Sequence, residues 1–297
     1  MIAYPNVKVN LGLSVLRKRP DGYHDLETLF IPYFDIHDTL EIIKGDDFSR
    51  TSASLFERYS FGGSEVPGGT PPDEGMSIRQ GIREDGKLMI TIARAEGVHW
   101  DPLNDLTAKA YALLDEEFGL PPVKIFLEKT SPVGAGLGGG SADAAFALRM
   151  LSELFALGLD DAALAGRAAR LGSDCAFFVY NRPMLGTGRG EILEPYDIDL
   201  SQYELRVAVP AGVSVGTADA YRGIVPREAA AGRAPSLREA LALPAAHWRG
   251  SLLNDFETTV FAKYPAIARA KQALYDAGAV YASMSGSGSA VFGLFPR

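Results

Sequence analysis

The chain has 297 residues, of which 29 are basic and 37 acidic, so its formal net charge is −8. This acidic balance argues against a general nucleic-acid or anionic-membrane surface, although an anionic ligand can still bind in a locally basic pocket. Hydrophobic residues make up 47% of the sequence, which is enough to build a sizeable core in one large domain or two ordinary ones. No apolar run approaches the roughly 20 residues that cross a bilayer.

The N-terminus and the cysteine content indicate the compartment. Residues 1–5 lack the charged and then apolar layout of a signal peptide. Cys175 is the only cysteine, so it cannot form an internal disulfide, which fits a reducing environment. We therefore expect a soluble cytoplasmic protein, a monomer or weak homodimer, with no nucleic-acid and no membrane partner.

The first predicted elements are strands. Residues 7–11 alternate between apolar and polar side chains, and apolar runs follow at 26–34 and 39–43. Together they predict an early, mostly antiparallel sheet. The segment 45–86 is rich in Gly, Pro and Ser, which predicts a surface insertion before a further strand at 88–92.

Helices and strands then alternate. The patterns predict a helix over 105–118, a strand over 123–127, a helix from about Ser141 and a helix over 160–171 that ends at Gly172. In the last third of the sequence the patterns predict a strand over 205–210, a weak helix within 228–246, a helix over 267–277 and two strands around 286–288.

The segment 131–145, SPVGAGLGGGSADAA, carries the strongest chemical signal. Five of the seven residues at 134–140 are glycine, so the backbone can adopt positive φ angles and approach a ligand closely. A predicted helix starts directly afterwards, and its free N–H groups and positive dipole end favour an anion. The segment is therefore a candidate phosphate site.

Known glycine motifs compete for this segment. Gly134, Gly136 and Gly139 match the dinucleotide fingerprint G-x-G-x-x-G, which usually lies in an early βαβ unit. Gly134 and Gly139 also have the outer spacing of a P-loop, but Gly140 stands where the phosphate-binding lysine must be. A lysine-free phosphate cradle and an ordinary turn before a helix remain.

Residues 132–141, PVGAGLGGGS, resemble the ATP-phosphate motif of the GHMP kinases, and the triple glycine followed by Ser-x-Asp-Ala-Ala resembles the diphosphocytidyl-methylerythritol kinase branch. Two more family motifs are matched in the expected order. Residues 8–24 contain Lys-x-Asn-Leu-x-Leu and then Asp-Gly-Tyr-His, which is close to a signature of that branch. Residues 284–289, MSGSGS, resemble the third GHMP motif, a glycine loop that packs near the first.

The resemblance implies an α+β fold of two lobes. The N-terminal lobe would be like domain 2 of ribosomal protein S5, with a left-handed crossover, and the C-terminal lobe would be ferredoxin-like. We accordingly expect an ATP-binding domain over 1–160 and a substrate-binding domain over 161–297, with catalysis in the cleft between them. The implied reaction is phosphorylation of the 2-hydroxyl of diphosphocytidyl-methylerythritol by ATP and Mg²⁺, giving the 2-phosphate and ADP in the non-mevalonate isoprenoid pathway.

The resemblance assigns the chemistry to Lys8 and Asp174. Asp174 lies in LGSDCAFF, which matches the family pattern Leu-Gly-x-Asp-x-x-Phe. Phosphoryl transfer needs a group that accepts the hydroxyl proton, and a carboxylate can do so. A nearby ammonium would keep that carboxylate ionised. The alternative is a plain ion pair between two elements.

The resemblance also implies the ATP contacts. The glycine motif supplies Pro132, Gly134, Ala135, Gly136, Leu137, Gly138, Gly139, Gly140 and Ser141, and Ser141 is also a candidate ligand of the ATP-bound Mg²⁺. The backbone of Lys129 corresponds to a position that contacts adenine. The chain departs from the branch at two places, since Ala142 replaces a usual serine and the adenine-contacting asparagine is either Asn104 or replaced by Asp105.

The substrate contacts follow in the same way. The resemblance implies Asn10, Tyr23, His24, Tyr33, Thr217, Tyr221, Gly286, Ser287 and Gly288. Tyr23 and Tyr221 would sandwich the cytosine, His24 would hydrogen-bond its edge, and Thr217 would touch the diphosphate.

Three other functions are weighed against this one. Another GHMP kinase, acting on mevalonate, homoserine or a sugar, would share the glycine loops but has no need of Asp-Gly-Tyr-His. A non-catalytic nucleotide- or RNA-binding module would favour a basic surface, and an oxidoreductase would bind NAD. The four histidines have no ligand-like spacing, so we expect no protein-bound metal, and Cys175 is expected to be a small buried residue.

Overall fold

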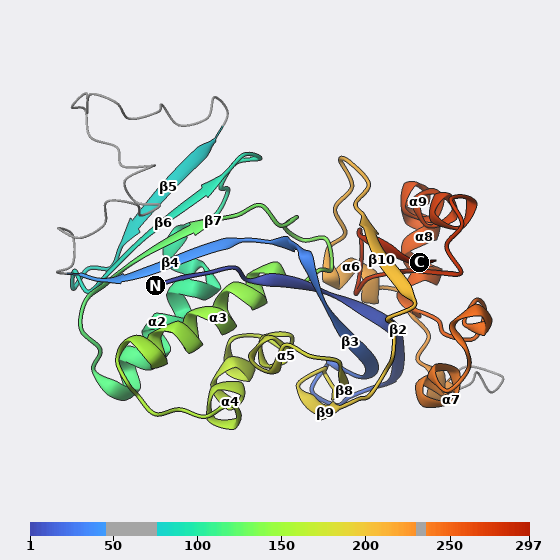
Figure 1. The fold of residues 1–297 in the computed structure, drawn as a ribbon, viewed down its shortest axis with the longest axis horizontal. Helices are drawn as coiled ribbons and strands as arrows, with labels where there is room; N and C mark the ends of the chain where they lie inside the picture. Colours follow the sequence, from blue (N-terminus) through green and yellow to red (C-terminus); the bar gives the residue numbers. More distant parts are fainter. Residues whose placement is uncertain (46–75, 230–235) are drawn as a thin grey trace. The chain divides into compact units, whose positions relative to one another are not determined.

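The structure is a computed structural model that describes residues 1–45, 76–229 and 236–297 (Figure 1). The chain forms two compact units, and each is discontinuous in sequence. The first unit contains Met1–Asn6, Asp35–Ser131 and Gly139–Val179, and the second contains Val7–Phe34, Pro132–Gly138 and Tyr180–Arg297. Both units thus draw on residues before and after 160, and the family domain boundary predicted there stays a prediction.

A five-stranded sheet in the order β1-β4-β7-β6-β5 forms the centre of the first unit. Its strands are β1 (Ile2–Ala3), β4 (Thr39–Lys44), β5 (Ser77–Ile82), β6 (Leu88–Arg94) and β7 (Val123–Glu128). β6 and β7 are parallel, whereas the other neighbours are antiparallel. The register aligns Ile42, Ile125 and Ile90 across the sheet, and all three are fully buried. The strands predicted at 39–43, 88–92 and 123–127 are confirmed.

The helices of this unit are α2 (Leu106–Phe118), α3 (Gly139–Leu154), α4 (Asp161–Leu171) and α5 (Cys175–Tyr180), with a 3-10 turn η1 (Pro102–Asn104) before α2. Helices α2 and α3 pack side by side along one face of the sheet, and α4 packs on both (Figure 1). The side chain of Asp105 caps α2 and that of Asp160 caps α4. The predicted helices are confirmed, although α3 begins at Gly139, two residues before the predicted start.

The second unit contains two antiparallel sheets. One has the order β2-β3-β8-β9, with β2 (Asn6–Lys18), β3 (His24–His37), β8 (Met184–Gly188) and β9 (Ile192–Pro195). The other has the order β10-β12-β11, with β10 (Tyr203–Ala208), β11 (Tyr281–Met284) and β12 (Val291–Pro296). Its helices are α6 (Thr217–Tyr221), α7 (Leu237–Leu241), α8 (Phe256–Lys263) and α9 (Pro265–Asp276), with 3-10 turns η2 (Arg227–Ala229) and η3 (Ala245–His247). The fold is α+β, as predicted.

Three details of the prediction need correction. The first three predicted strands do not share a sheet. β2 and β3 pair in one sheet, whereas β4 pairs with β1 and β7 in another. The predicted insertion is wrong for 77–82, which form the edge strand β5, while 46–75 lie outside the described residues. Of the weak helix within 228–246, the structure shows only α7 and short turns, and 230–235 are not described.

Gly12 in β2 provides a test of the packing in the second unit. Its φ is +74°, and a β-carbon there would lie 2.4 Å from Cδ1 of Leu237 and 2.6 Å from Cδ1 of Leu252. Gly22 has a similar φ of +88° but nothing within 4 Å of such a carbon. We expect Gly12→Ala to lower the free energy of unfolding by about 1–3 kcal/mol more than Gly22→Ala, because only Gly12→Ala overpacks the core. Urea denaturation of both variants measures the difference, and equal losses would contradict this account.

Candidate active site

Lys8 and Asn10 of β2 lie against the glycine loop, residues 132–138, within the second unit. The ammonium of Lys8 donates to Oδ1 of Asn10 (2.6 Å) and to the carbonyl of Gly136 (2.9 Å), and its backbone N–H donates to the carbonyl of Leu137 (2.9 Å). Asn10 in turn donates to Oγ1 of Thr28 on β3 (3.0 Å). Both side chains are only 2% exposed. The motif that contains Lys8 and Asn10 therefore meets the glycine motif of residues 132–141, and Nζ of Lys8 is held at the loop backbone.

The third motif packs onto the same loop. Gly134, Gly136 and Gly138 have φ angles of +71°, +77° and +74°. A β-carbon on Gly136 would lie 2.2 Å from the carbonyl oxygen of Ser285 and 3.1 Å from the backbone nitrogen of Gly288. The hydroxyl of Ser285 also donates to the carbonyl of Gly136 (2.9 Å). The prediction that the last glycine loop packs near the first is confirmed.

Asn254 supports this last loop and was not identified from the sequence. Its amide donates to the carbonyls of Met284 and Gly286, at 2.8 Å each, and it is 2% exposed. A single asparagine 30 residues before its partners gives no local signal. Its two hydrogen bonds hold the start of the loop in one conformation.

The turn that carries Asp-Gly-Tyr-His is shaped by its own side chains. Asp21 accepts from the backbone N–H of Tyr23 (3.1 Å), and the N–H of Arg19 donates to the carbonyl of Tyr23 (2.8 Å). Gly22 takes the left-handed conformation that this tight turn requires. The turn thus ends with Tyr23 on the surface, and β3 begins at the next residue, His24.

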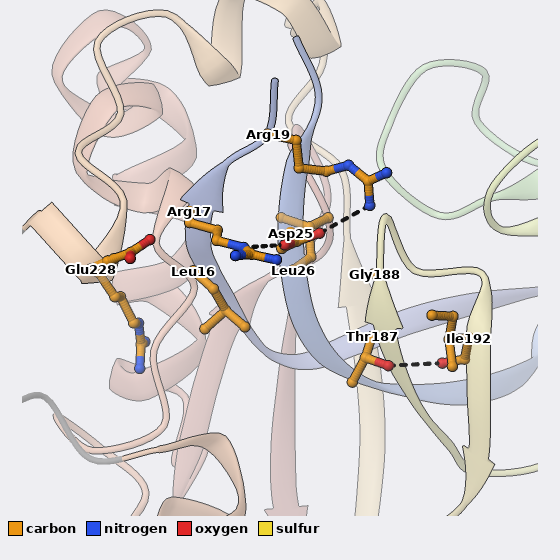
Figure 2. A pocket seen from close by; sticks show the side chains of 10 residues that line it. Leu16, Arg17, Arg19, Asp25, Leu26, Thr187, Gly188, Ile192 and Glu228 are labelled. Carbon is orange, nitrogen blue, oxygen red and sulfur yellow. Dashed lines mark hydrogen bonds and ion pairs between the residues drawn. The ribbon is translucent and has the colours of Figure 1, made fainter. Parts of the chain in front are cut away.

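A hollow of about 690 Å³ lies beside this turn. Figure 2 shows the side chains that line it. Within it Arg17 and Arg19 both bind Asp25, at 2.5 and 3.1 Å, and their guanidinium groups hold the pKa of that carboxyl below its usual range. Arg227 forms two bonds of 2.9 Å with Asp255. These basic groups are thus bound to carboxylates, and the ion pairs of Arg17 and Arg19 with Asp25 connect the ends of β2 and β3.

His24 lines a second pocket of about 610 Å³ in the same unit. Its ring stacks on Tyr221, with centroids 4.7 Å apart and planes at 21°, and Tyr221 meets Phe256 edge to face. The pocket is lined by Arg17, Lys18, His24, Tyr221, Arg222, Gly223, Ile224, Pro226 and Glu228. Burial lowers the pKa of His24 below its ordinary value of 6.5, and the nearby Lys18 lowers it further. His24 is therefore neutral at pH 7.

The ring that stacks on Tyr221 is thus that of His24. Tyr23 is 57% exposed, with the guanidinium of Arg189 lying 5.1 Å from its ring centroid. The sandwich of cytosine between Tyr23 and Tyr221 stays a prediction. Tyr33 is half-buried in β3 and Thr217 is exposed at the start of α6, and their roles also remain predictions.

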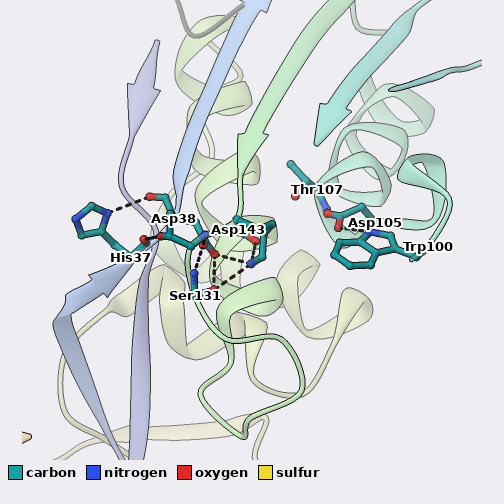
Figure 3. Close-up of polar contacts among 9 residues, drawn as sticks. His37, Asp38, Trp100, Asp105, Thr107, Ser131 and Asp143 are labelled. Carbon is teal, nitrogen blue, oxygen red and sulfur yellow. Dashed lines mark hydrogen bonds and ion pairs between the residues drawn. The ribbon is translucent and has the colours of Figure 1, made fainter. Parts of the chain in front are cut away.

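A buried polar cluster lies in the first unit, and Figure 3 shows Asp38, Ser131 and Asp143 pointing toward one another. The ammonium of Lys129 donates to Asp38 (2.5 Å), Asp143 (2.7 Å) and the hydroxyl of Ser131 (3.2 Å). None of the four residues is more than 5% exposed. The lysine side chain is therefore internal, while the predicted adenine contact of its backbone stays a prediction. Asp143 lies in the motif Ser-x-Asp-Ala-Ala but was assigned no role from the sequence, and Asp38 was not identified from it.

The carboxylate of Asp105 is engaged by its own surroundings. It accepts from the backbone N–H of Thr107 (2.9 Å) and from Nε1 of Trp100 (3.1 Å), whereas Asn104 is exposed. Because Asp105 caps α2, its replacement of an asparagine is compatible with the helix start. The contact of Asn104 or Asp105 with adenine stays a prediction.

The remaining predicted residues of the first unit are Ser141, Asp174 and Cys175. Ser141 and Asp174 are partly exposed, and Cys175 is fully buried, as predicted. Burial raises the pKa of the Cys175 thiol to about 12, so the residue is an inert part of the core. Asp174 and Lys8 belong to different compact units, and their pairing stays a prediction.

The part of the chain that the structure describes contains neither a metal-ligand cluster nor a membrane-spanning helix. Among residues 1–45, 76–229 and 236–297, no three His, Cys, Asp or Glu side chains are grouped so as to hold a metal ion. No helix in those ranges has the length and apolar character of a membrane span.

Known proteins identify the family. The GHMP kinase N-terminal domain matches residues 105–182, and the GHMP kinase C-terminal domain matches residues 227–297. A 4-diphosphocytidyl-2-C-methyl-D-erythritol kinase from Bacteroides fragilis is 44% identical over 295 residues, covering 99% of this chain and 92% of the relative. The chain belongs to the 4-diphosphocytidyl-2-C-methyl-D-erythritol kinase family of GHMP kinases. A family member from Cytophaga hutchinsonii is 40% identical with the same coverage.

Solved structures agree with this assignment. A crystal structure of 4-(cytidine 5'-diphospho)-2C-methyl-D-erythritol kinase matches with a TM-score of 0.70 and 30% identity, covering 99% of this chain and 90% of that one. A homoserine kinase from Cytophaga hutchinsonii matches with a TM-score of 0.62 and 18% identity, covering 99% and 86%. At that identity the second match shows the GHMP fold alone, and the predicted fold and family are both confirmed.

The contact at Gly136 generates a test. Gly134 and Gly136 have nearly the same φ, but the nearest atom to a β-carbon on Gly134 is the hydroxyl of Ser214 at an ordinary 3.5 Å. A β-carbon on Gly136 meets the backbone of Ser285 instead. We expect Gly136→Ala to destabilise the protein by about 1–3 kcal/mol more than Gly134→Ala. Thermal unfolding without nucleotide measures this, and equal midpoints would show that the two loops do not pack as described.

Proposed function

We propose that this protein transfers the terminal phosphoryl group of ATP to the 2-hydroxyl of 4-diphosphocytidyl-2-C-methyl-D-erythritol, giving the 2-phosphate and ADP in the non-mevalonate isoprenoid pathway. The observation that carries the proposal is 44% identity over nearly the whole chain to a relative named for that substrate. The turn that brings His24 to Tyr221 supports the cytidine part of the assignment, because it provides aromatic surface for a base.

The glycine loop is proposed to bind the ATP phosphates. Its glycines allow close approach of the backbone, and α3 begins directly after it, so the first N–H groups of the helix are available to an anion. Mg²⁺ would arrive with ATP, held mainly by phosphate oxygens, and the hydroxyl of Ser141 in the first turn of α3 is a suitable protein ligand. When bound, the ion would neutralise phosphate charge.

Lys8 and Asp174 are proposed to carry the proton transfer. The carboxylate of Asp174 would accept the proton of the substrate hydroxyl, and the ammonium of Lys8 would stabilise the charge that develops on the reacting oxygens. Asn10 and the carbonyl of Gly136 already fix the ammonium at the loop, so it needs no reorganisation when ATP binds.

The pocket of His24 and Tyr221 is proposed to take the cytidine diphosphate. Lys18 lines this pocket and would offset diphosphate charge, whereas Arg17 and Arg222 are already paired with Asp25 and Asp219. The neutral imidazole of His24 has one donor and one acceptor nitrogen, which suits the edge of cytosine. A GHMP kinase that acts on a smaller alcohol would not need this aromatic pocket.

ADP release with ATP and Mg²⁺ tests the reaction, with diphosphocytidyl-methylerythritol compared against mevalonate, homoserine and galactose. We expect turnover on the cytidine substrate alone, and a loss of kcat by about 10²-fold or more in Asp174→Asn, because the variant lacks the proton acceptor. Asp161→Asn, an exposed carboxylate of the same unit, is the matched control and should keep full activity.

Turnover on another alcohol instead would keep the kinase chemistry and refute the substrate. Full activity of Asp174→Asn would refute the proton acceptor.

The lowered pKa of His24 predicts a pH effect on substrate binding. Because His24 is neutral at pH 7, it gains a proton only as the pH falls below 6.5, and the new charge lies near Lys18. We expect the KM for the cytidine substrate to rise as the pH falls from about 7.5 to 5.5, while the KM for ATP stays flat. Steady-state kinetics measure both values. His24→Gln should abolish the trend, and a trend that persists in this variant would assign it to another group.

A further inference from the structure

The glycine loop is closed at its base by the two residues that flank it. Residues 132–138 follow Ser131 and precede Gly139, and both flanking residues belong to the first unit. A β-carbon on Gly139 would lie 2.3 Å from Oγ of Ser131 and 3.4 Å from Nζ of Lys129. The start and the end of the loop are therefore in direct contact, and a glycine is needed at the end.

Asp38 holds the start of the loop. It lies between β3 and β4 and is fully buried. Its Oδ1 accepts from the backbone N–H groups of Thr130 and Ser131, at 2.7 Å each, and its Oδ2 accepts from the hydroxyl of Ser131 (2.7 Å) and the ammonium of Lys129 (2.5 Å). Four donors therefore converge on one carboxylate, which is the arrangement of an ionised acid.

Lys129 joins this carboxylate to the helix at the end of the loop. An ammonium has three N–H donors, and Lys129 directs them to Asp38, to Asp143 on α3 and to Ser131. All three acceptors are internal, and the side chain of Lys129 is 3% exposed. Lys129 is thus not a phosphate-binding lysine of the P-loop kind, although it lies close to the glycine loop in sequence.

The charges of the cluster do not balance if both acids are ionised. Asp143 accepts from Lys129 on Oδ2, and its buried Oδ1 has no hydrogen-bond partner among residues 1–45, 76–229 and 236–297. An ionised carboxylate with an unpaired buried oxygen is costly, whereas a neutral acid there costs much less. Burial raises the pKa of Asp143 well above its usual range, while contacts with Lys129 and Ser131 outweigh burial and lower that of Asp38.

We propose that Asp38 and Lys129 are positioning residues for ATP: their ion pair, with Ser131, fixes both ends of the loop 132–138, and Asp143 is protonated so that the cluster is neutral. This inference rests on the proposed function, since it takes the loop to be the ATP-phosphate site. None of these side chains touches the reacting atoms. Their effect is on the loop conformation and hence on ATP affinity.

Replacing each of the two aspartates by asparagine then has a different effect. Asp38→Asn removes the ionised partner of a buried ammonium and replaces an acceptor of four hydrogen bonds, so the loop start is released. Asp143→Asn replaces a neutral acid by a neutral amide whose oxygen can still accept from Lys129. A structural role alone does not distinguish ATP from the other substrate, so the ratio of the two KM values decides the question.

The experiment compares wild type with Asp38→Asn, Ser131→Ala and Asp143→Asn. The readouts are the thermal midpoint, the KM for ATP, the KM for the cytidine substrate, and equilibrium dialysis with ATP alone. We expect the KM and Kd for ATP to rise about tenfold or more in Asp38→Asn and severalfold in Ser131→Ala, and to stay within about twofold in Asp143→Asn. The KM for the cytidine substrate should change by less than about twofold throughout.

Each outcome has one meaning. Wild type that neither binds ATP nor phosphorylates the substrate refutes the proposed function. Active wild type with unchanged ATP affinity in Ser131→Ala and in folded Asp38→Asn refutes the positioning role. Ser131→Ala keeps this test available if Asp38→Asn fails to fold, because it removes two hydrogen bonds without leaving an unpaired charge. A loss in Asp143→Asn as large as that in Asp38→Asn refutes the protonation assignment.

Discussion

The carbonyl of Gly136 is the point on which the arrangement of the second unit depends. It accepts from the ammonium of Lys8 and from the hydroxyl of Ser285, at 2.9 Å each, so strand β2 and the loop before β12 both meet the glycine loop there. This approach requires a residue without a β-carbon, since such an atom would lie 2.2 Å from the oxygen of Ser285. The glycine at 136 is thus needed for packing as well as for ligand approach.

Sequence patterns predicted the strands and helices well, because the spacing of hydrophobic residues and the capping of helices depend on residues that are close in the sequence. The alternation at 7–11 and the run at 39–43 both form strands. Which sheet a strand joins depends on distant partners, however, and residues of β4 pair with residues of β7 such as Thr39 with Glu128 and Lys44 with Val123, far apart in the sequence. Strand β5, SIRQGI, was missed because it is polar, lies at a sheet edge and contains a glycine.

The site was predictable where its chemistry is contained in a short motif. The glycine loop, Lys8 and His24 all lie in such motifs. Asp38 and Asn254 do not, since their partners are 91 and 30 residues away. Asp143 lies in the motif Ser-x-Asp-Ala-Ala, and its place among buried alanines and leucines of the helix 139–154 is a further signal, because an acid on a buried helix face needs a partner or a proton.

The two lysines near the glycine loop are distinguished by their hydrogen-bond acceptors. Lys129 is bound by carboxylates and a hydroxyl in a site closed to water, so its charge is compensated within the fold. Lys8 donates to an amide oxygen and a backbone carbonyl, which orient its ammonium at the glycine loop. A loop that is to bind phosphates tolerates a neutral buried cluster at the residues that flank it but not a negative one, because repulsion acts strongly at low dielectric. The proton assigned to Asp143 and the position of Lys8 therefore meet the same electrostatic requirement.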